Sequence, residues 1–302
     1  MNTFEEPAYS VQSLSTPVES PEPAAGGLPS SPQFHANNPP WGLPQALLTW
    51  FLSLVLLVCV QLIVSVAYIV YRQQQGIAPD IQSLTKDKTF IFINVLSYFP
   101  IHLLTFLLGW AVVTQMGRFN FWQTIGWSWP PNLGLWKSAG LAVLLFGMAL
   151  VLSGLFGGQE TDIERIVQSS RPTAYALAIL AVATAPLVEE VVYRGVLYPA
   201  LQRAIGMTGA VTLVAGLFAI GHVYQYWPNF GVISAIVLLS ISLTLVRACT
   251  GRLLPCFIIH LVFNGIQSVG IVLAPYIRAL DSGREQTAAS ILMVFRFLLS
   301  LS

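Results

Sequence analysis

Long apolar runs without a formal charge make up most of the chain beyond residue 45. A membrane-spanning helix needs about 20 mostly apolar residues. Runs of roughly this length or longer occupy 46–71, 89–117, 138–159, 172–188, 204–246 and 253–277. The run at 204–246 is too long for one span, and the sequence Tyr226-Trp-Pro-Asn229 divides it into segments near 209–225 and 230–246. The pattern predicts seven spans, and the shorter apolar stretch 288–302 is either an eighth, partial helix or an interfacial one.

Composition agrees with an all-α polytopic membrane protein of seven to eight transmembrane helices. The chain is 55% hydrophobic and 9% charged, whereas soluble domains carry about 25% charged residues. Its 14 Lys and Arg against 13 Asp and Glu give no basic excess for nucleic acid. Three cysteines without a Cys-x-x-Cys spacing support neither a disulfide framework nor a zinc ribbon. The lipid bilayer is therefore an expected partner and nucleic acid is not.

The first 40 residues differ from the rest. They hold eight of the 19 prolines, four Glu, and no Lys or Arg, a composition that cannot bury enough apolar surface to fold. We predict a disordered Pro/Ser-rich tail over 1–40, which contains His35. The tail has no secretory signal pattern and no Arg/Ser-rich transit pattern. This favours a bacterial cell membrane and leaves a thylakoid or organellar membrane open.

Basic residues give only a weak signal for orientation in the membrane. Seven spans place seven Lys and Arg on the side of the 72–88 loop, namely Arg72, Lys86, Lys88, Arg165, Arg171, Arg278 and Arg284. Five lie on the other side: Arg118, Lys137, Arg203, Arg247 and Arg252. The bias of seven to five would put the N-terminus outside the cytoplasm.

Ionisable residues within predicted spans are costly and are candidates for function. Glu189 and Glu190 follow the fourth apolar run directly. Glu190 and Arg194 are four residues apart and therefore neighbours on a helix, where an ion pair would ease their burial. Glu189, about 100° around the helix, would then be the uncompensated carboxylate. Such a group suits a general base, although a helix end that exposes both carboxylates to water is the plainer alternative.

Two further polar sites lie in later spans. His260 and Asn264 share one helical face and offer groups for a metal or an oxyanion. His222 follows an apolar run with Gly209, Gly216 and Gly221. Each of these could equally be an interhelical hydrogen bond.

His102, in the second span, has a simpler reading. Tyr98 and Thr105 are one turn away on either side, so local hydrogen bonds would satisfy its ring. We interpret His102 as a packing residue.

The polar sites are expected to meet at one depth. At 1.5 Å per residue, Glu189 lies about 21 Å from the end of its span near Arg203. His222 lies about 21 Å from Thr208, just after the turn near Gly206, and His260 and Asn264 lie about 10–17 Å from the same side. Agreement to within about two helical turns, on the fourth, fifth and seventh spans, indicates one site.

Three motifs in this order resemble those of the CAAX prenyl protease type II family, within the wider CPBP or Abi group of intramembrane proteases. They stand here as Glu189-Glu190-Val-Val-Tyr-Arg194, Phe218-Ala-Ile-Gly-His222 and His260-Leu-Val-Phe-Asn264. The resemblance covers roughly residues 172–270. It implies a helical protein with a water-filled intramembrane cavity that cleaves membrane-associated proteins or peptides.

The resemblance also implies roles for these residues. Glu189 would activate a water together with His222, and His260 and Asn264 would stabilise the oxyanion. Glu190 and Arg194 would support the architecture. Family members are commonly described as metalloproteases, so Glu189, His222 and His260 could instead hold zinc. The compact His-Glu-x-x-His spacing of many catalytic zinc sites is absent, which favours a glutamate-activated water.

The expected organisation is thus a tail at 1–40, N-terminal transmembrane helices at 41–171, a CAAX protease-like core at 172–270, and a C-terminal loop with a short apolar helix at 271–302. The leading hypothesis is an intramembrane endopeptidase. One alternative is a non-catalytic scaffold or bacteriocin-immunity-type protein. Another is a proton-linked transporter, although no inverted repeat supports it.

Overall fold

The computed structural model describes residues 38–77 and 80–281. The chain divides into two units, Met1–Gln33 and Phe34–Ser302, and every described residue lies in the second. The predicted tail up to residue 37, with His35, and the apolar stretch 288–302 fall outside the described residues. The described part is helical and contains no strand, which confirms the predicted all-α fold.

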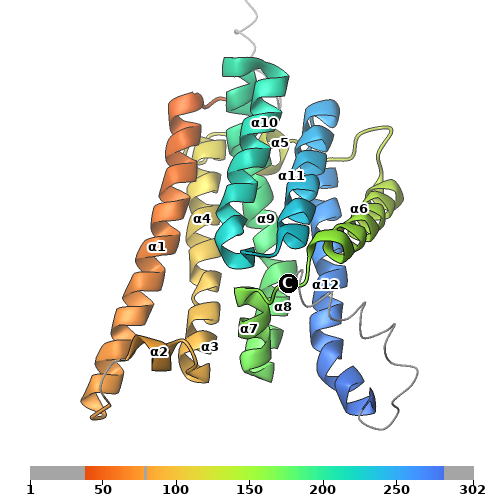
Figure 1. The fold of residues 1–302 in the computed structure, drawn as a ribbon. Coiled ribbons are helices and arrows are strands. Elements are labelled where there is room, and N and C mark those ends of the chain that lie inside the picture. Colours follow the sequence, from red (N-terminus) through yellow and green to blue (C-terminus); the bar gives the residue numbers. More distant parts are fainter. Residues whose placement is uncertain (1–37, 78–79, 282–302) are drawn as a thin grey trace, which may run out of the picture. The chain divides into compact units, whose positions relative to one another are not determined.

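Long helices run through the bundle in alternating directions (Figure 1). Six helical segments are long and apolar enough to cross a membrane, and one of them, Arg171–Tyr226, is 56 residues long. This segment contains Gly206, whose φ of 76° and ψ of 174° are not helical, and the chain reverses there as predicted. Counting it as two passes gives the seven predicted spans within the described residues.

The first half of the chain builds three passes and the short helices between them. These are α1 (Leu43–Gln74), α2 (Ile81–Leu84), α3 (Lys88–Leu96), α4 (Tyr98–Thr114), α5 (Phe121–Thr124), α6 (Leu135–Phe156) and α7 (Asp162–Ser169). The second predicted span is divided at Ser97, between α3 and α4. Pro100 has no N–H to offer the carbonyl of Leu96, four residues earlier, which explains a break at this point.

The second half builds four passes. Its elements are α8 (Arg171–Ala183), α9 (Ala185–Glu189), the π-helix η1 (Glu190–Leu197), α10 (Tyr198–Tyr226), α11 (Phe230–Thr250) and α12 (Leu254–Asp281). Asn229 caps α11 by accepting the N–H of Val232 at 3.1 Å. The helix boundaries therefore lie close to the predicted ones, because charged and turn-forming residues end each apolar run.

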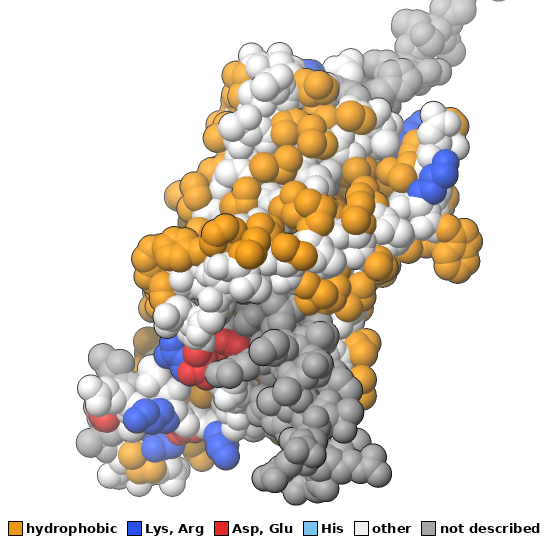
Figure 2. All heavy atoms as spheres, turned by 45° about the vertical axis from the view of Figure 1, so that its right-hand side comes forward, with side chains coloured by type: hydrophobic (Ala, Val, Ile, Leu, Met, Phe, Trp, Pro, Cys, Tyr) orange, Lys and Arg blue, Asp and Glu red, His pale blue; other side chains and the backbone are white. Residues whose placement is uncertain are grey.

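The helices differ in how much of their surface faces outward. In the most hydropathic window of α1 only 6% is buried, against 44% in α12, so α1 is peripheral and α12 central. Figure 2 shows hydrophobic side chains across the middle of the visible face, acidic side chains near its lower end, and basic side chains at both its lower and its upper end. This distribution is that of a membrane-embedded bundle whose apolar surface contacts lipid.

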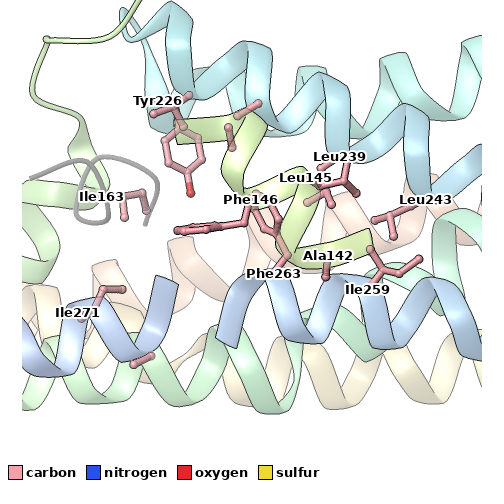
Figure 3. Packing of buried hydrophobic residues seen from close by; sticks show 14 of the residues in the cluster. Ala142, Leu145, Phe146, Ile163, Tyr226, Leu239, Leu243, Ile259, Phe263 and Ile271 are labelled. Carbon is pink, nitrogen blue, oxygen red and sulfur yellow. The ribbon is translucent and has the colours of Figure 1, made fainter. Parts of the chain in front are cut away.

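Two hydrophobic clusters hold the bundle together. The first joins α6, α11 and α12 with parts of α7, α8 and α10, and Figure 3 shows Phe146, Phe263 and Leu239 meeting from three of these helices. The second joins η1 and the first half of α10 to α4, α5 and Trp41. Ile259 and Phe263 flank His260 in the first cluster, while Val191 follows Glu190 in the second. The candidate site residues therefore lie where the two clusters adjoin.

Candidate active site

Glu189 ends a helix that begins at an interruption. Thr184, between α8 and α9, has φ −121° and ψ −43°, and Pro186 lacks the N–H that would continue the helix. After Glu189 the chain continues as the π-helix η1, a form that is rare and frequent at functional sites. The side chain of Glu190 is fully buried while that of Glu189 remains 24% exposed. The two adjacent carboxylates thus occupy different environments.

The buried member of this pair is neutralised by an arginine. Arg194 Nη1 donates to Glu190 Oε1 at 3.0 Å, and both side chains are completely buried. The spacing predicted this ion pair. Arg194 also donates to α11, through Nε to Thr244 Oγ1 at 3.2 Å and through Nη2 to Ser240 Oγ at 2.8 Å. Its remaining donors therefore have partners, which a buried charge requires.

His260 of α12 lies between the two glutamates. Its Nδ1 is 2.9 Å from Glu190 Oε1 and its Nε2 is 3.7 Å from Glu189 Oε2. A carboxylate can only accept a hydrogen bond, so Nδ1 carries the proton toward Glu190. The distance to Glu189 is too long for a direct hydrogen bond. A third group can therefore contact both Nε2 and the Glu189 carboxylate.

Phe218 connects the histidines to the buried ion pair. The Arg194 guanidinium lies 4.6 Å from the centre of its ring. The same ring stacks on His222 at 4.6 Å between centroids and meets the edge of His260 at 6.0 Å. Sequence reasoning noted Phe218 only as the first residue of a motif. Its place four residues before His222, on the same helical face, was the signal that it shares the site.

His222 turns one ring nitrogen toward its own helix. Nδ1 is 2.8 Å from the carbonyl oxygen of Phe218, so it carries the proton, and Nε2 is left as an acceptor. Asn264 donates through Nδ2 to the carbonyl oxygen of Ala181 in α8 at 3.0 Å. One amide N–H of Asn264 is thus used in helix packing, and its other N–H and its oxygen are not used by that bond.

The sequence-predicted residues come together to different degrees. Glu189, Glu190, Arg194 and His260 form a contiguous set, and His222 joins it through Phe218. Asn264 is one helical turn from His260. The local hydrogen bonds expected for His102 were wrong: its Nδ1 lies 2.7 Å from Thr184 Oγ1, in another part of the chain.

The residues named as possible zinc ligands are Glu189, His222 and His260. Each histidine has Nδ1 bonded to another group, the Phe218 carbonyl or Glu190, which leaves Nε2 as the nitrogen that could bind a metal, as in many zinc sites. Among residues 38–77 and 80–281, however, no three or more His, Cys, Asp or Glu side chains are grouped so that they could hold a metal. As placed, these side chains therefore do not form a three-ligand zinc site.

The geometry can be compared with known proteins. Residues 171–266 match the family model of the type II CAAX prenyl endopeptidase Rce1-like proteins. No curated protein and no solved structure gives a significant match. The matched region, about a third of the chain, includes α8 to η1, α10, α11 and the first half of α12. Glu189, Glu190, Arg194, His222, His260 and Asn264 all lie within it, and over this region the chain is similar to the type II CAAX prenyl endopeptidase Rce1-like family.

Proposed function

We propose that the protein is an intramembrane endopeptidase that hydrolyses peptide bonds of membrane-associated proteins or peptides. The observation that carries the proposal is the different surroundings of the adjacent carboxylates. Glu190 is buried and paired, while Glu189 is partly exposed and 3.7 Å from His260 Nε2. A partly exposed carboxylate beside an imidazole, within a membrane helix bundle, is suited to moving a proton from water to a leaving group.

In the proposed reaction Glu189 takes a proton from water. The Nε2 of His222, unprotonated because Nδ1 faces the Phe218 carbonyl, accepts the other hydrogen bond of this water and orients it. The water oxygen then attacks the carbonyl carbon of the scissile peptide bond. The proton on Glu189 passes to the amide nitrogen as the carbon–nitrogen bond breaks, which leaves a free amine and a carboxylic acid.

His260 and Asn264 would stabilise the negative charge on the carbonyl oxygen. Glu190 accepts the Nδ1–H of His260 and orients the ring, as the aspartate of a serine protease triad does for its histidine. When Nε2 also carries a proton, it donates to the oxyanion. The Asn264 N–H that is not bonded to Ala181 supplies a second donor. Removing one such donor typically costs about 100- to 1,000-fold in rate.

Glu190 and Arg194 act as support in this scheme. Their bonds to each other, to His260 and to α11 fix the His260 ring relative to Glu189.

The test is cleavage of a quenched fluorescent membrane-peptide library by detergent-solubilised wild type and Glu189→Gln, each with and without a chelator. We expect Glu189→Gln to lose at least about 100-fold in rate and the wild type to keep its activity with chelator. Glu160→Gln, which changes an exposed glutamate in a loop, is the matched control and should cleave normally.

Each other outcome has a defined meaning. Loss of wild-type activity with chelator would replace the water mechanism by a metal-dependent one. A folded Glu189→Ala protein that cleaves at the wild-type rate would refute Glu189 as the base. A folded wild type that cleaves no peptide in the library would favour the non-catalytic scaffold.

A further inference from the structure

Helix α4 runs alongside the segment that carries Glu189, in the same direction (Figure 1). It contacts this segment at two points. At the first, His102 Nδ1 lies 2.7 Å from Thr184 Oγ1. At the second, a Cβ on Gly109 would lie only 3.0 Å from Val191 Cγ1, so the two backbones approach closely.

The spacing of these contacts is the same on both partners. His102 and Gly109 are seven residues apart, as are Thr184 and Val191, and seven residues are close to two helical turns. Glu189 lies between the two contact points along its segment. Helix α4, which lies outside the region matched by the family model, therefore borders the catalytic segment on both sides of Glu189.

The His102 contact lies at the interruption between α8 and α9. Thr184 has non-helical backbone angles, and Pro186 cannot donate the hydrogen bond that would join α9 to α8. The direction of α9, and with it the position of Glu189, thus depends on how Thr184 is held. The Gly109 contact brings only apolar atoms together, so His102 supplies the directional bond.

The hydrogen bonds of Thr184 indicate which group is the donor and which the acceptor at this contact. The single hydroxyl proton of Thr184 is donated to the Leu180 carbonyl at 3.3 Å. Thr184 Oγ1 is therefore the acceptor, and His102 donates from Nδ1. The rings of Tyr98 and His102 meet in an edge-to-face arrangement, with centroids 6.1 Å apart.

We infer that His102 is a positioning residue of the catalytic site, which sets the place of Glu189 by holding Thr184 at the junction of α8 and α9. The inference rests on the proposed function, because it assigns His102 to the reaction that Glu189 carries out. It adds to the site a residue from the N-terminal helices.

The experiment compares cleavage by His102→Ala, His102→Asn and Thr184→Val in the full-length protein in detergent. His102→Ala and Thr184→Val each remove one side of the bond. We expect each to lower kcat about 10- to 100-fold, since small misplacements of a catalytic group are costly, with KM changed less than about threefold. The double variant should be no slower than either single variant, because both act through one contact.

Two further variants separate positioning from general damage. The side-chain amide of asparagine can place a donor near the position of Nδ1, so His102→Asn should recover most of the lost kcat. Asn94→Ala is the matched control. It removes a half-buried polar side chain of α3 that accepts a hydrogen bond from Ser65 of α1, and it should leave kcat unchanged.

Amide hydrogen exchange provides a measurement that does not depend on catalytic activity. Exchange across residues 185–197 should become faster in His102→Ala and return toward wild type in His102→Asn. Unchanged kcat and unchanged exchange in His102→Ala, with an active wild type, would overturn the inference alone. An inactive, folded wild type would overturn the proposed function, while faster exchange in His102→Ala would still support the contact as the one that positions Glu189.

Discussion

Glu189 and Glu190 are chemically identical neighbours whose loss should have opposite consequences. The Glu190 side chain is fully buried and bonded to Arg194 and His260. That of Glu189 is partly exposed and has a contact of 3.7 Å to His260. Removing a partner from a buried ion pair leaves an uncompensated charge, whereas neutralising a partly exposed carboxylate does not. Stability should therefore depend on the Glu190 pair, and activity on Glu189.

Arg194→Ala tests this division. It leaves Glu190 buried without its counter-charge, and we expect the free energy of unfolding to fall by about 3–5 kcal/mol. Thermal unfolding in detergent, followed by a thiol-reactive or intrinsic fluorescence signal, measures the change. Glu189→Gln should shift the free energy of unfolding by no more than about 0.5 kcal/mol.

The control for Arg194 is an exposed arginine. Arg118, in the loop after α4, is exposed, and Arg118→Ala should change stability by no more than about 0.5 kcal/mol. Similar destabilisation by Arg194→Ala and Arg118→Ala would contradict a supporting role for the buried pair.

Sequence spacing was sufficient to find most of the site, for a physical reason. Pairs four residues apart share a helical face, so Glu190 with Arg194, Phe218 with His222, and His260 with Asn264 could each be recognised locally. The hydrogen bond of His102 could not be recognised in this way, because its partner Thr184 is 82 residues away. The sequence of α4 or α9 alone does not determine how the two helices are aligned. For His260 and Glu190, which are 2.9 Å apart, the sequence likewise predicted only a similar depth in the membrane and no direct contact.

At the level of elements, the π-helix η1 is supported from outside. Tyr198 N–H bonds the carbonyl of Tyr193, five residues back. Pro199 then has no N–H to give to the Arg194 carbonyl, and Arg247 Nε donates to that carbonyl at 3.0 Å instead. Trp41 Nε1 donates to the Val196 carbonyl at 3.0 Å. Buried carbonyls without partners are costly, so these two side chains stabilise the element that carries Glu190 and Arg194.

Helix boundaries were more predictable than helix type. Charged residues and turn sequences end each apolar run, so α6 and α11 begin and end within a few residues of the predicted 138–159 and 230–246. No comparable sequence signal indicates the change from α- to π-helix at Glu190. In a buried segment with apolar residues on all sides, a period of 3.6 residues cannot be distinguished from a longer one.

Asp87, which begins α3, gives the loop between the first two passes a pH dependence. Burial alone would raise the pKa of Asp87. Hydrogen bonds from Tyr68 and the backbone N–H groups of Phe90 and Thr89, together with the Arg72 charge, outweigh burial and hold the pKa below its usual value. A lowered pKa means that the ionised carboxylate stabilises the fold. This contribution is complete above the unfolded-state pKa of about 3.9 and is lost as pH falls through the folded-state pKa.

Asp87→Asn should therefore be less stable than wild type at pH 7, by about 1 kcal/mol, and the difference should shrink below about pH 4. Thermal unfolding in detergent from pH 7 to pH 3 measures both. Asp162→Asn is the control. Asp162 pairs with Arg165 at 2.8 Å, but both side chains are about half exposed, so little change is expected at any pH. A stability difference for Asp87→Asn that stays constant down to pH 3 would contradict the assignment.

For the whole molecule, the number of passes and the burial of Arg247 both affect the predicted orientation in the membrane. The sequence count of seven basic residues against five included Arg247 among those facing the opposite side. In the structure Arg247 is fully buried and donates to the Arg194 carbonyl, so it cannot act as a loop charge. The count becomes seven to four, which strengthens the bias that places the 75–87 loop and α7 in the cytoplasm. Residues 115–134 and the turn at Gly206 would then face the other side.

Single-cysteine labelling tests this orientation in intact cells. The three native cysteines, Cys59, Cys249 and Cys256, are first replaced. Ser83→Cys, in α2, and Ser128→Cys, between α5 and α6, are then introduced separately. Alternating passes put these positions on opposite sides (Figure 1). A membrane-impermeant maleimide should label the Ser128→Cys protein in intact cells, and the Ser83→Cys protein only after the cells are opened. The reverse pattern would invert the orientation and keep the seven passes. The single pass formed by α3 and α4 separates α2 from α5. Labelling of both proteins in intact cells would therefore require a different number of passes between α2 and α5.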